Sequence, residues 1–472
     1  MKTNIKMAWR NLWRNKRRTL ITTASVFFAV IFALIMRSMQ LGTYSHLYKS
    51  IIESYTGYVQ VQHEDFWDDR MLDNGFFLTS EMEQQILSID NVEGIIPHLE
   101  SGALASNEIQ TKGVLILGID PIKENKISKL DDKLVFLRLT KSAIKDLIHE
   151  DIAVEYKKIF EGLEGESYAN LASLQLDLNV GDDAFESLLP LIEKYAAYPG
   201  TYLNPGDNGV LLGDKLSKYL KLNVGDTLVL LGQGYHGVSA NGKFPVKGLI
   251  RIPNPLIENM AVFMDISTCQ YFSSGDQLTT SAILDLKDNS DKAVSRTKAE
   301  LLEMYKGTEY TAKDWREMNE TLIKQLEADN QGGLIMLVIL YLIIAFGVFG
   351  TVLMMTAERK REFGVLISIG MQRSKLAFIM AIEMIFIGLL GILSGIAGSI
   401  PIVIYGYYNP IQLTGESAKM YEEYGFDPVM KFLWFDDYYF WQSMIVMLIV
   451  MIAIIYPVRK ILRIKEIEAL RA

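Results

Sequence analysis

AERKREFGVLISIGMQRSKL, residues 357–376, is a dense block of charge between two long apolar runs. The block holds seven charged side chains, two glycines and a short apolar repeat of Phe363, Leu366 and Ile367. A plain loop between two membrane helices needs neither acidic side chains nor an apolar face. The flanks decide what kind of protein this is, and the block itself requires a further role.

Four apolar segments are long enough to cross a bilayer as helices, since a hydrocarbon core of ~30 Å needs about 20 residues. Hydrophobic residues make up 50% of the chain's 472 residues, which is high for a soluble protein. Four buried helices of a soluble enzyme are the alternative, but core helices are seldom uncharged over such lengths. The predicted spans are 20–41, 331–357, 376–405 and 438–458.

Basic residues gather in three segments that four spans would place on one side of the membrane. The first 18 residues hold seven Lys and Arg and no acid, while 356–375 and 457–472 each hold five basic and two acidic residues. Positive charge beside span ends marks the cytoplasmic face. We therefore expect cytoplasmic termini, with the tail at 459–472. A large domain at 42–330 and a short loop at 406–437 then lie outside the cytoplasm.

The first segment, 1–19, is predicted to be an amphipathic helix at the cytoplasmic membrane surface. Ile5, Trp9, Leu12 and Trp13 fall on one helical face, and Lys and Arg cover the rest. Tryptophan and basic residues in this arrangement suit the headgroup layer better than a disordered basic tail does. The apolar run that follows is longer than a signal-peptide core, so 20–41 is interpreted as a retained anchor.

The domain at 42–330 alternates strand-like and helical segments, which predicts an α+β fold. Residues 131–198 differ, because they are helical in pattern and acidic, and they indicate an inserted subdomain. The insertion is either a solvated decoration or a docking element. The strand-like segments are 57–62, 113–119, 209–213, 226–232, 244–250 and 260–266, and the helical ones are 80–89, 213–221, 291–305 and 313–330.

One stretch of this domain matches a phosphate-binding loop in its letters only. Gly237 to Lys243 fits G-x-x-x-x-G-K, but Phe244 stands where a Ser or Thr would bind Mg²⁺. A strand is expected to follow instead of a helix, so Asn241-Gly242 is interpreted as a hairpin turn. No catalytic residue and no metal site is predicted, and the single cysteine, Cys269, excludes an intrachain disulfide.

The third span carries two notable features. Four glycines at spacings of three and four share one helical face, which suits close helix packing, although glycine is also generally tolerated in membrane helices. Glu383 lies inside the same span, where an acid is costly. It is either a proton or substrate site or a structural partner of a neighbouring helix or a nearby Arg or Lys. The glycines are Gly388, Gly391, Gly395 and Gly398.

Taken together, these stretches resemble the FtsX-like permeases of ATP-binding cassette (ABC) systems, in their lipoprotein-releasing and MacB-like branch. The resemblance covers nearly the whole chain except 131–198. The stretches that carry it are WRNLWRNKRRTLIT (9–22), 357–395 with its charged block, YPVRKILRIKEIEALRA (456–472), and, in the outer domain, 209–232 and 246–266.

The resemblance implies an α-helical inner-membrane protein of a bacterium, with four spans per protomer and a periplasmic α+β domain between the first and second. It implies a non-catalytic permease working by mechanotransmission in a type VII ABC transporter. Two copies of a cytoplasmic ATPase would bind ATP and Mg, beside a second permease protomer, identical or paralogous. Lipoprotein release is the expected function. The alternatives are tripartite efflux of peptides or drugs and regulation of a cell-wall hydrolase.

Within this family the charged block, 358–375, corresponds to a coupling helix that sits in a groove of the ATPase. Lipoprotein cargo and a periplasmic chaperone or fusion protein are further expected partners, besides the lipid bilayer; nucleic acid is not one. The expected coupling residues are Glu358, Arg361, Glu362, Phe363, Gly364, Leu366, Ile367 and Gly370.

Overall fold

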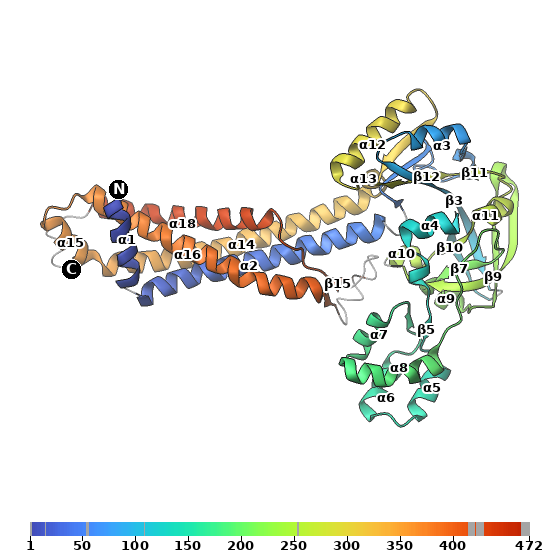
Figure 1. The fold of residues 1–472 in the computed structure, drawn as a ribbon, viewed down its shortest axis with the longest axis horizontal. Helices are drawn as coiled ribbons and strands as arrows, with labels where there is room; N and C mark the ends of the chain where they lie inside the picture. The colour runs from blue at the N-terminus through green and yellow to red at the C-terminus, as the bar shows by residue number, and fades with distance from the viewer. Residues whose placement is uncertain are drawn as a thin grey trace. The chain divides into compact units, whose positions relative to one another are not determined.

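The computed structural model of the chain describes residues 2–14, 16–52, 56–107, 109–252, 254–413, 421 and 429–463. They form two compact units (Figure 1). The helical unit comprises Met1–His46, Thr321–Thr414 and Pro428–Ala472, and the α/β unit comprises Leu47–Glu320 and Gly415–Asp427. Within the predicted loop 406–437 and tail 459–472, residues 414–420, 422–428 and 464–472 lie outside the described residues.

Four long helices lie alongside one another in the helical unit, and one apolar core joins them (Figure 1). All four are long and apolar enough to cross a membrane, over Thr19–Lys49, Ile323–Glu358, Arg373–Tyr408 and Tyr438–Leu462. The predicted fold class, four spans with a large α+β domain between the first and second, is therefore confirmed. The elements are α1 (Lys2–Arg14), α2 (Lys16–Ile51), α14 (Glu320–Glu358), α15 (Lys360–Ser368), α16 (Arg373–Tyr408) and α18 (Tyr438–Leu462), with the paired strands β14 (Ile411–Gln412) and β15 (Val429–Met430).

Two of the spans belong to longer helices than predicted, since α2 continues past residue 41 to Ile51 and α14 begins at Glu320, before residue 331. Polar bonds between the two helices explain the extension. Arg37 Nη1 donates to Asn330 Oδ1 at 2.8 Å, and the Tyr44 hydroxyl donates to the Asp329 carboxylate. These polar side chains bond to one another between the two helices. A prediction that follows apolar runs ends the span at such residues, although the helix continues.

The glycine face of α16 packs against neighbouring helices. A Cβ added to Gly391 would lie 2.5 Å from Cβ of Val26 on α2, and one on Gly395 would lie 2.7 Å from Cβ of Val30. Gly398 also faces α2, whereas Gly388 faces α18. The absence of side chains thus lets the helix backbones approach closely.

The α/β unit is built around a nine-stranded sheet in the order β13-β1-β12-β3-β4-β10-β7-β9-β8. Because β3 pairs with both β4 and β8, six of the strands, β3 to β8 in this order, close into a ring that has no free edge. The strands are β1 (Val59–His63), β3 (Val92–Ser106), β4 (Thr111–Ile119), β7 (Val210–Gly213), β8 (Thr227–Gln233), β9 (Ser239–Ile250), β10 (Ala261–Asp265), β12 (Ser281–Leu286) and β13 (Tyr310–Asp314).

The long strand β3 belongs to two substructures. Its first half pairs with β12 in an open sheet that shares an apolar core with α3 and α12, and its second half closes the ring, whose core includes α9 and α11. The helices are α3 (Ser80–Leu87), α4 (Pro121–Ser128), α9 (Asp214–Leu220), α10 (Pro255–Glu258), α11 (Ile266–Ser273), α12 (Asp291–Met304) and α13 (Trp315–Met318). Shorter elements are β2 (Phe76–Phe77), β11 (Leu278–Thr279), η2 (Leu72–Asn74), η3 (Asp131–Lys133) and η4 (Tyr235–Gly237).

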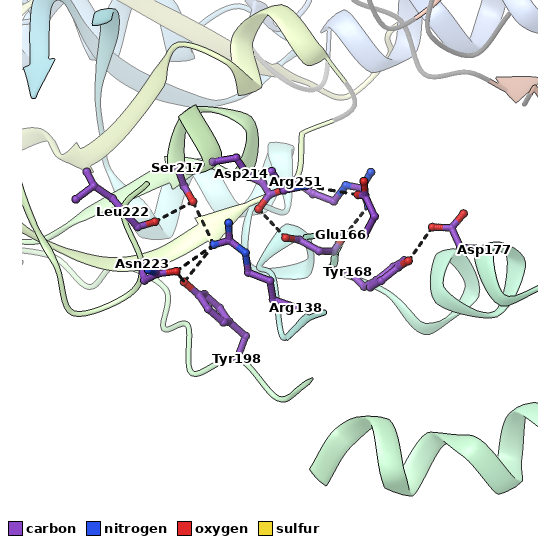
Figure 2. A network of polar contacts seen from close by, with 12 residues as sticks. Arg138, Glu166, Tyr168, Asp177, Tyr198, Asp214, Ser217, Leu222, Asn223 and Arg251 are labelled. Atoms are coloured by element: carbon purple, nitrogen blue, oxygen red, sulfur yellow. Dashed lines mark hydrogen bonds and ion pairs between the residues drawn. The ribbon is translucent and has the colours of Figure 1, made fainter. Parts of the chain in front are cut away.

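The insertion predicted at 131–198 is mainly helical, has an apolar core of its own and also contains a two-stranded sheet. Figure 2 shows the polar network that connects it to the ring. Ser167 Oγ donates to Asp214 Oδ1 at 2.8 Å, and Arg251 Nη1 donates to the Ser167 carbonyl at 2.6 Å. Its elements are β5 (Leu137–Arg138), α5 (Lys141–His149), α6 (Val154–Gly162), β6 (Ser167–Tyr168), α7 (Leu171–Leu178) and α8 (Asp182–Ala196).

The hairpin turn predicted at Asn241-Gly242 is wrong. Both residues lie within β9, where Gly242 pairs with Leu230 of β8. The turn lies earlier, between the paired residues Gln233 and Ser239. Within this five-residue loop, 234–238, His236 and Gly237 have positive φ angles of 54° and 76°.

Candidate functional site

The charged block folds into the short helix α15, between the spans α14 and α16. Gly370 ends this helix with a φ of +99°, a conformation that strains other residues. Its amide donates to the Ile367 carbonyl at 2.9 Å, and the Met371 amide donates to the Leu366 carbonyl at 3.0 Å. This Schellman-type cap satisfies the last carbonyls, so the helix stops at Ser368 and the chain turns into α16.

The apolar face of α15 is turned inward, so the expected coupling residues on this face are not available to a partner. Phe363, Gly364 and Ile367 are buried, and Phe363 and Ile367 belong to the core that joins the four long helices. Leu366 is half-buried and packs against the same core. An apolar helix face is as well suited to the chain's own interior as to a partner, and here it fixes α15 to the helical unit.

The outward face of α15 carries a different set of residues. Arg361 and Glu362 are exposed, and so are two apolar residues, Val365 at 42% and Ile369 at 79%. Glu358, the last residue of α14, is also exposed. Protein interfaces combine an apolar core with a polar rim, and these exposed residues offer both kinds of side chain. Val365 and Ile369 are thus candidate contact residues that the sequence pattern did not single out.

Glu383, the acid inside the third span, forms an ion pair with the residue that precedes α15. Arg359, which precedes α15, donates from Nη1 to both carboxylate oxygens of Glu383 on α16, each at 2.8 Å. The two side chains are only 7% and 6% exposed. Arg359 also lies 5.4 Å from the ring centre of Phe363. Among the alternatives for Glu383, the structure shows the partner of a nearby arginine.

A second pair extends this contact to the first helix of the chain. Glu362 accepts from Arg359 Nε at 3.4 Å and from Arg14 Nη2 on α1 at 2.7 Å. Arg14, Glu362, Arg359 and Glu383 therefore form a continuous ionic chain across α1, α15 and α16. We call these four residues the ionic chain.

The first helix lies against the third span through its apolar side. Ala8 and Leu12 are buried, and the Trp9 ring meets the Phe386 ring of α16 edge to face, with 5.7 Å between their centres. Trp9 and Trp13 remain 44% and 55% exposed. Helix α1 ends at Arg14, earlier than the predicted segment 1–19, and α2 begins at Lys16.

Comparison with known proteins places this site in a family. Residues 334–465, which contain α15, α16 and α18, match the FtsX-like permease C-terminal family. Over this segment the chain is similar to the FtsX-like permeases. Two proteins of Xylella fastidiosa, from strains Temecula1 and 9a5c, are described as the lipoprotein-releasing system transmembrane protein LolC. The first is 26% identical to this chain over 206 residues, and the second is 28% identical over 208 residues. Each alignment covers 42% of this permease and 48% of the relative, so the permease spans about half the length of the curated relatives it matches.

Two solved structures align loosely with this permease. The periplasmic region of MacB from Actinobacillus actinomycetemcomitans is 12% identical, with a TM-score of 0.30, over 58% of this chain and 95% of that one. The extracellular domain of the transporter YknZ from Gram-positive bacteria is 11% identical, with a TM-score of 0.28, over 55% of this chain and 100% of that one.

Arg359 and Arg14, like Val365 and Ile369, are residues of this site that the sequence did not assign. The signal for Arg359 was present, since Glu383 is the one acid of the third span and an acid in a membrane helix needs a partner. Arg359, Lys360 and Arg361 were equal candidates by position. The structure shows which of them pairs with Glu383. Arg359 lies in the turn between α14 and α15 and is directed inward, where it is buried.

Proposed function

We propose that this permease is the membrane subunit of an ABC transporter and that α15 receives the motion of a separate ATPase. The observation that carries the proposal is the construction of α15. One face of this helix is fixed to the spans by Phe363, Ile367 and the ionic chain, and the opposite face presents Val365 and Ile369 to solvent. A helix built in this way can pass a push from outside directly to α16.

The orientation follows from charge. Helices α1 and α15 are joined by the bond from Arg14 to Glu362, so both lie at one end of the helical unit, where basic residues are frequent. The positive-inside rule assigns that end to the cytoplasm. The α/β unit, connected in sequence through α2 and α14, is then periplasmic, and the permease resides in a bacterial inner membrane.

The transporter proposed here contains two ATPase copies and a second permease protomer. ATP and Mg would bind to the ATPases. ATP-driven closing of the ATPases would move α15, then the spans, and finally the α/β unit. In this mechanotransmission scheme cargo is handled outside the spans.

Lipoprotein release toward the outer membrane is the cargo proposal that the relatives favour. Its support is the similarity to LolC, which extends over 42% of the chain. A periplasmic chaperone would then receive the lipoprotein.

Depletion of the permease in its own cell tests this proposal. We expect lipoproteins to accumulate in the inner membrane and a small ATPase to purify with the tagged permease. Normal lipoprotein sorting would contradict the cargo assignment, and drug sensitivity with a co-purifying fusion protein would favour efflux instead. Purification without any ATPase, but with a cell-wall hydrolase, would contradict the transporter assignment itself.

A further inference from the structure

A cavity of about 540 Å³ lies where the end of α1, the beginning of α2 and the end of α14 meet. Three cationic side chains line it, those of Arg14, Lys16 and Arg17, and they face one carboxylate, Glu358. The α15 surface and the ionic chain do not account for Lys16 and Arg17. Within the residues that the structure describes, neither has an ion-pair partner.

The remaining wall of this cavity is apolar. It includes Ile21, Met354 and Met355, and of these Ile21 and Met354 are 49% and 64% exposed. Ile21 and Met354 lie within the first and second candidate spans, Thr19–Lys49 and Ile323–Glu358. The cavity thus has a cationic side at the end of the spans and an apolar side along them. A phospholipid matches this arrangement, because its charged headgroup lies at the membrane surface and its acyl chains run along the spans.

We propose that this cavity binds an anionic phospholipid, with the phosphate between Arg14, Lys16 and Arg17 and the acyl chains along Ile21 and Met354. Basic pockets between membrane helices on the cytoplasmic side are a recurrent form of headgroup site. A free inorganic anion would satisfy the cations but would leave the apolar wall uncovered. The leaflet named here rests on the proposed orientation, whereas the site itself depends only on the cavity.

Native mass spectrometry of the full permease in detergent tests the proposal, with phosphatidylglycerol and phosphatidylcholine as probes. Lys16→Gln with Arg17→Gln removes two cations of the cavity. Lys6→Gln with Arg10→Gln is the matched control, because both residues are exposed on α1 outside the cavity. We expect the first variant to bind phosphatidylglycerol about 30-fold more weakly, at about fivefold per cation. The control is expected to bind it like the unaltered protein.

Three outcomes would contradict the lipid site. The first is equal loss of phosphatidylglycerol in both variants, and the second is equal retention of phosphatidylglycerol and phosphatidylcholine by the unaltered protein. In the third, sodium phosphate protects the permease against heat as well as phosphatidylglycerol does, which would indicate an anion site only. The lipid measurement uses the isolated permease. A failure of ATPase binding or lipoprotein release in the depletion experiment would therefore contradict the proposed function and leave the lipid site unaffected.

Discussion

At the scale of single residues, the Arg359–Glu383 pair is a buried ion pair that joins the start of α15 to α16. Both side chains are nearly fully buried, and two bonds of 2.8 Å join them. A buried pair adds little over an apolar replacement, but removing one partner leaves an uncompensated charge. The pair therefore favours the packing arrangement in which Arg359 and Glu383 meet, even where it adds little net stability.

Replacing Arg359 by Gln is expected to destabilise the permease by about 3–5 kcal/mol, because Glu383 remains buried without its cation. Arg361→Gln is the matched control, and it is expected to change stability by less than about 0.5 kcal/mol since Arg361 is exposed. Denaturant unfolding in detergent measures both. A second variant, Arg359→Met with Glu383→Leu, should recover most of the loss. Equal stability of Arg359→Gln and Arg361→Gln would contradict the pairing.

In the α/β unit, His98 and Glu124 form a buried pair with 2.6 Å between Nε2 and Oε2. Burial lowers the pKa of His98, but the charge and hydrogen bond of Glu124 outweigh burial and leave that pKa above its usual 6.5. Burial raises the pKa of Glu124, and the charge and hydrogen bond of His98 leave it below its usual 4.5. The pair therefore stabilises the fold fully between about pH 4.5 and about pH 6.5.

Stability from this pair is expected to fall as pH rises through the folded-state pKa of His98, because the neutral ring loses its attraction to Glu124. It should also fall in acid, as Glu124 becomes protonated. Comparing thermal unfolding of the permease with that of His98→Gln/Glu124→Gln across pH 5–9 measures the difference. A difference in stability that stays constant from pH 5.5 to pH 9 would count against an ionised pair.

At the scale of elements, the four spans follow directly from the sequence, because a nearly uncharged run of about twenty residues is rare outside membrane helices. Several strands also follow from it. Strand β3 does not, since Gly94, Pro97 and Gly102 interrupt its apolar pattern although it is the longest strand of the sheet. Its two-sided pairing, which closes the ring, is a long-range property that no local pattern contains.

The close approach of α16 and α2 gives an element-scale prediction. Gly391→Val is expected to destabilise the permease by about 1–3 kcal/mol, because the added carbons collide with Val26. Gly347→Val on α14 makes the same change where a Cβ would meet no atom within 4 Å. Unfolding midpoints of the two variants in detergent should therefore differ clearly. Similar midpoints would mean that the glycine face is only tolerated.

At the scale of the whole molecule, charge distribution predicts the topology, and the family pattern points to α15 as the coupling element. Neither predicts which face of α15 is free. Phe363 and Ile367 are among the coupling residues that the family resemblance implies, and in the structure both are core residues of the helical unit. Glu362 is held by Arg14 and Arg359, so a change there alters the ionic chain as well as the surface.

In the function proposed above, a partner ATPase drives the permease through the outward face of α15. The most direct test measures ATPase co-purification and lipoprotein release for Ile369→Lys. Ile109→Lys is the matched control, because Ile109 is 90% exposed in the α/β unit. We expect Ile369→Lys to reduce both readouts at least about tenfold, equivalent to about 1.4 kcal/mol, with an unchanged unfolding midpoint. The control should retain both readouts. Full release and normal ATPase binding by a folded Ile369→Lys protein would contradict the account.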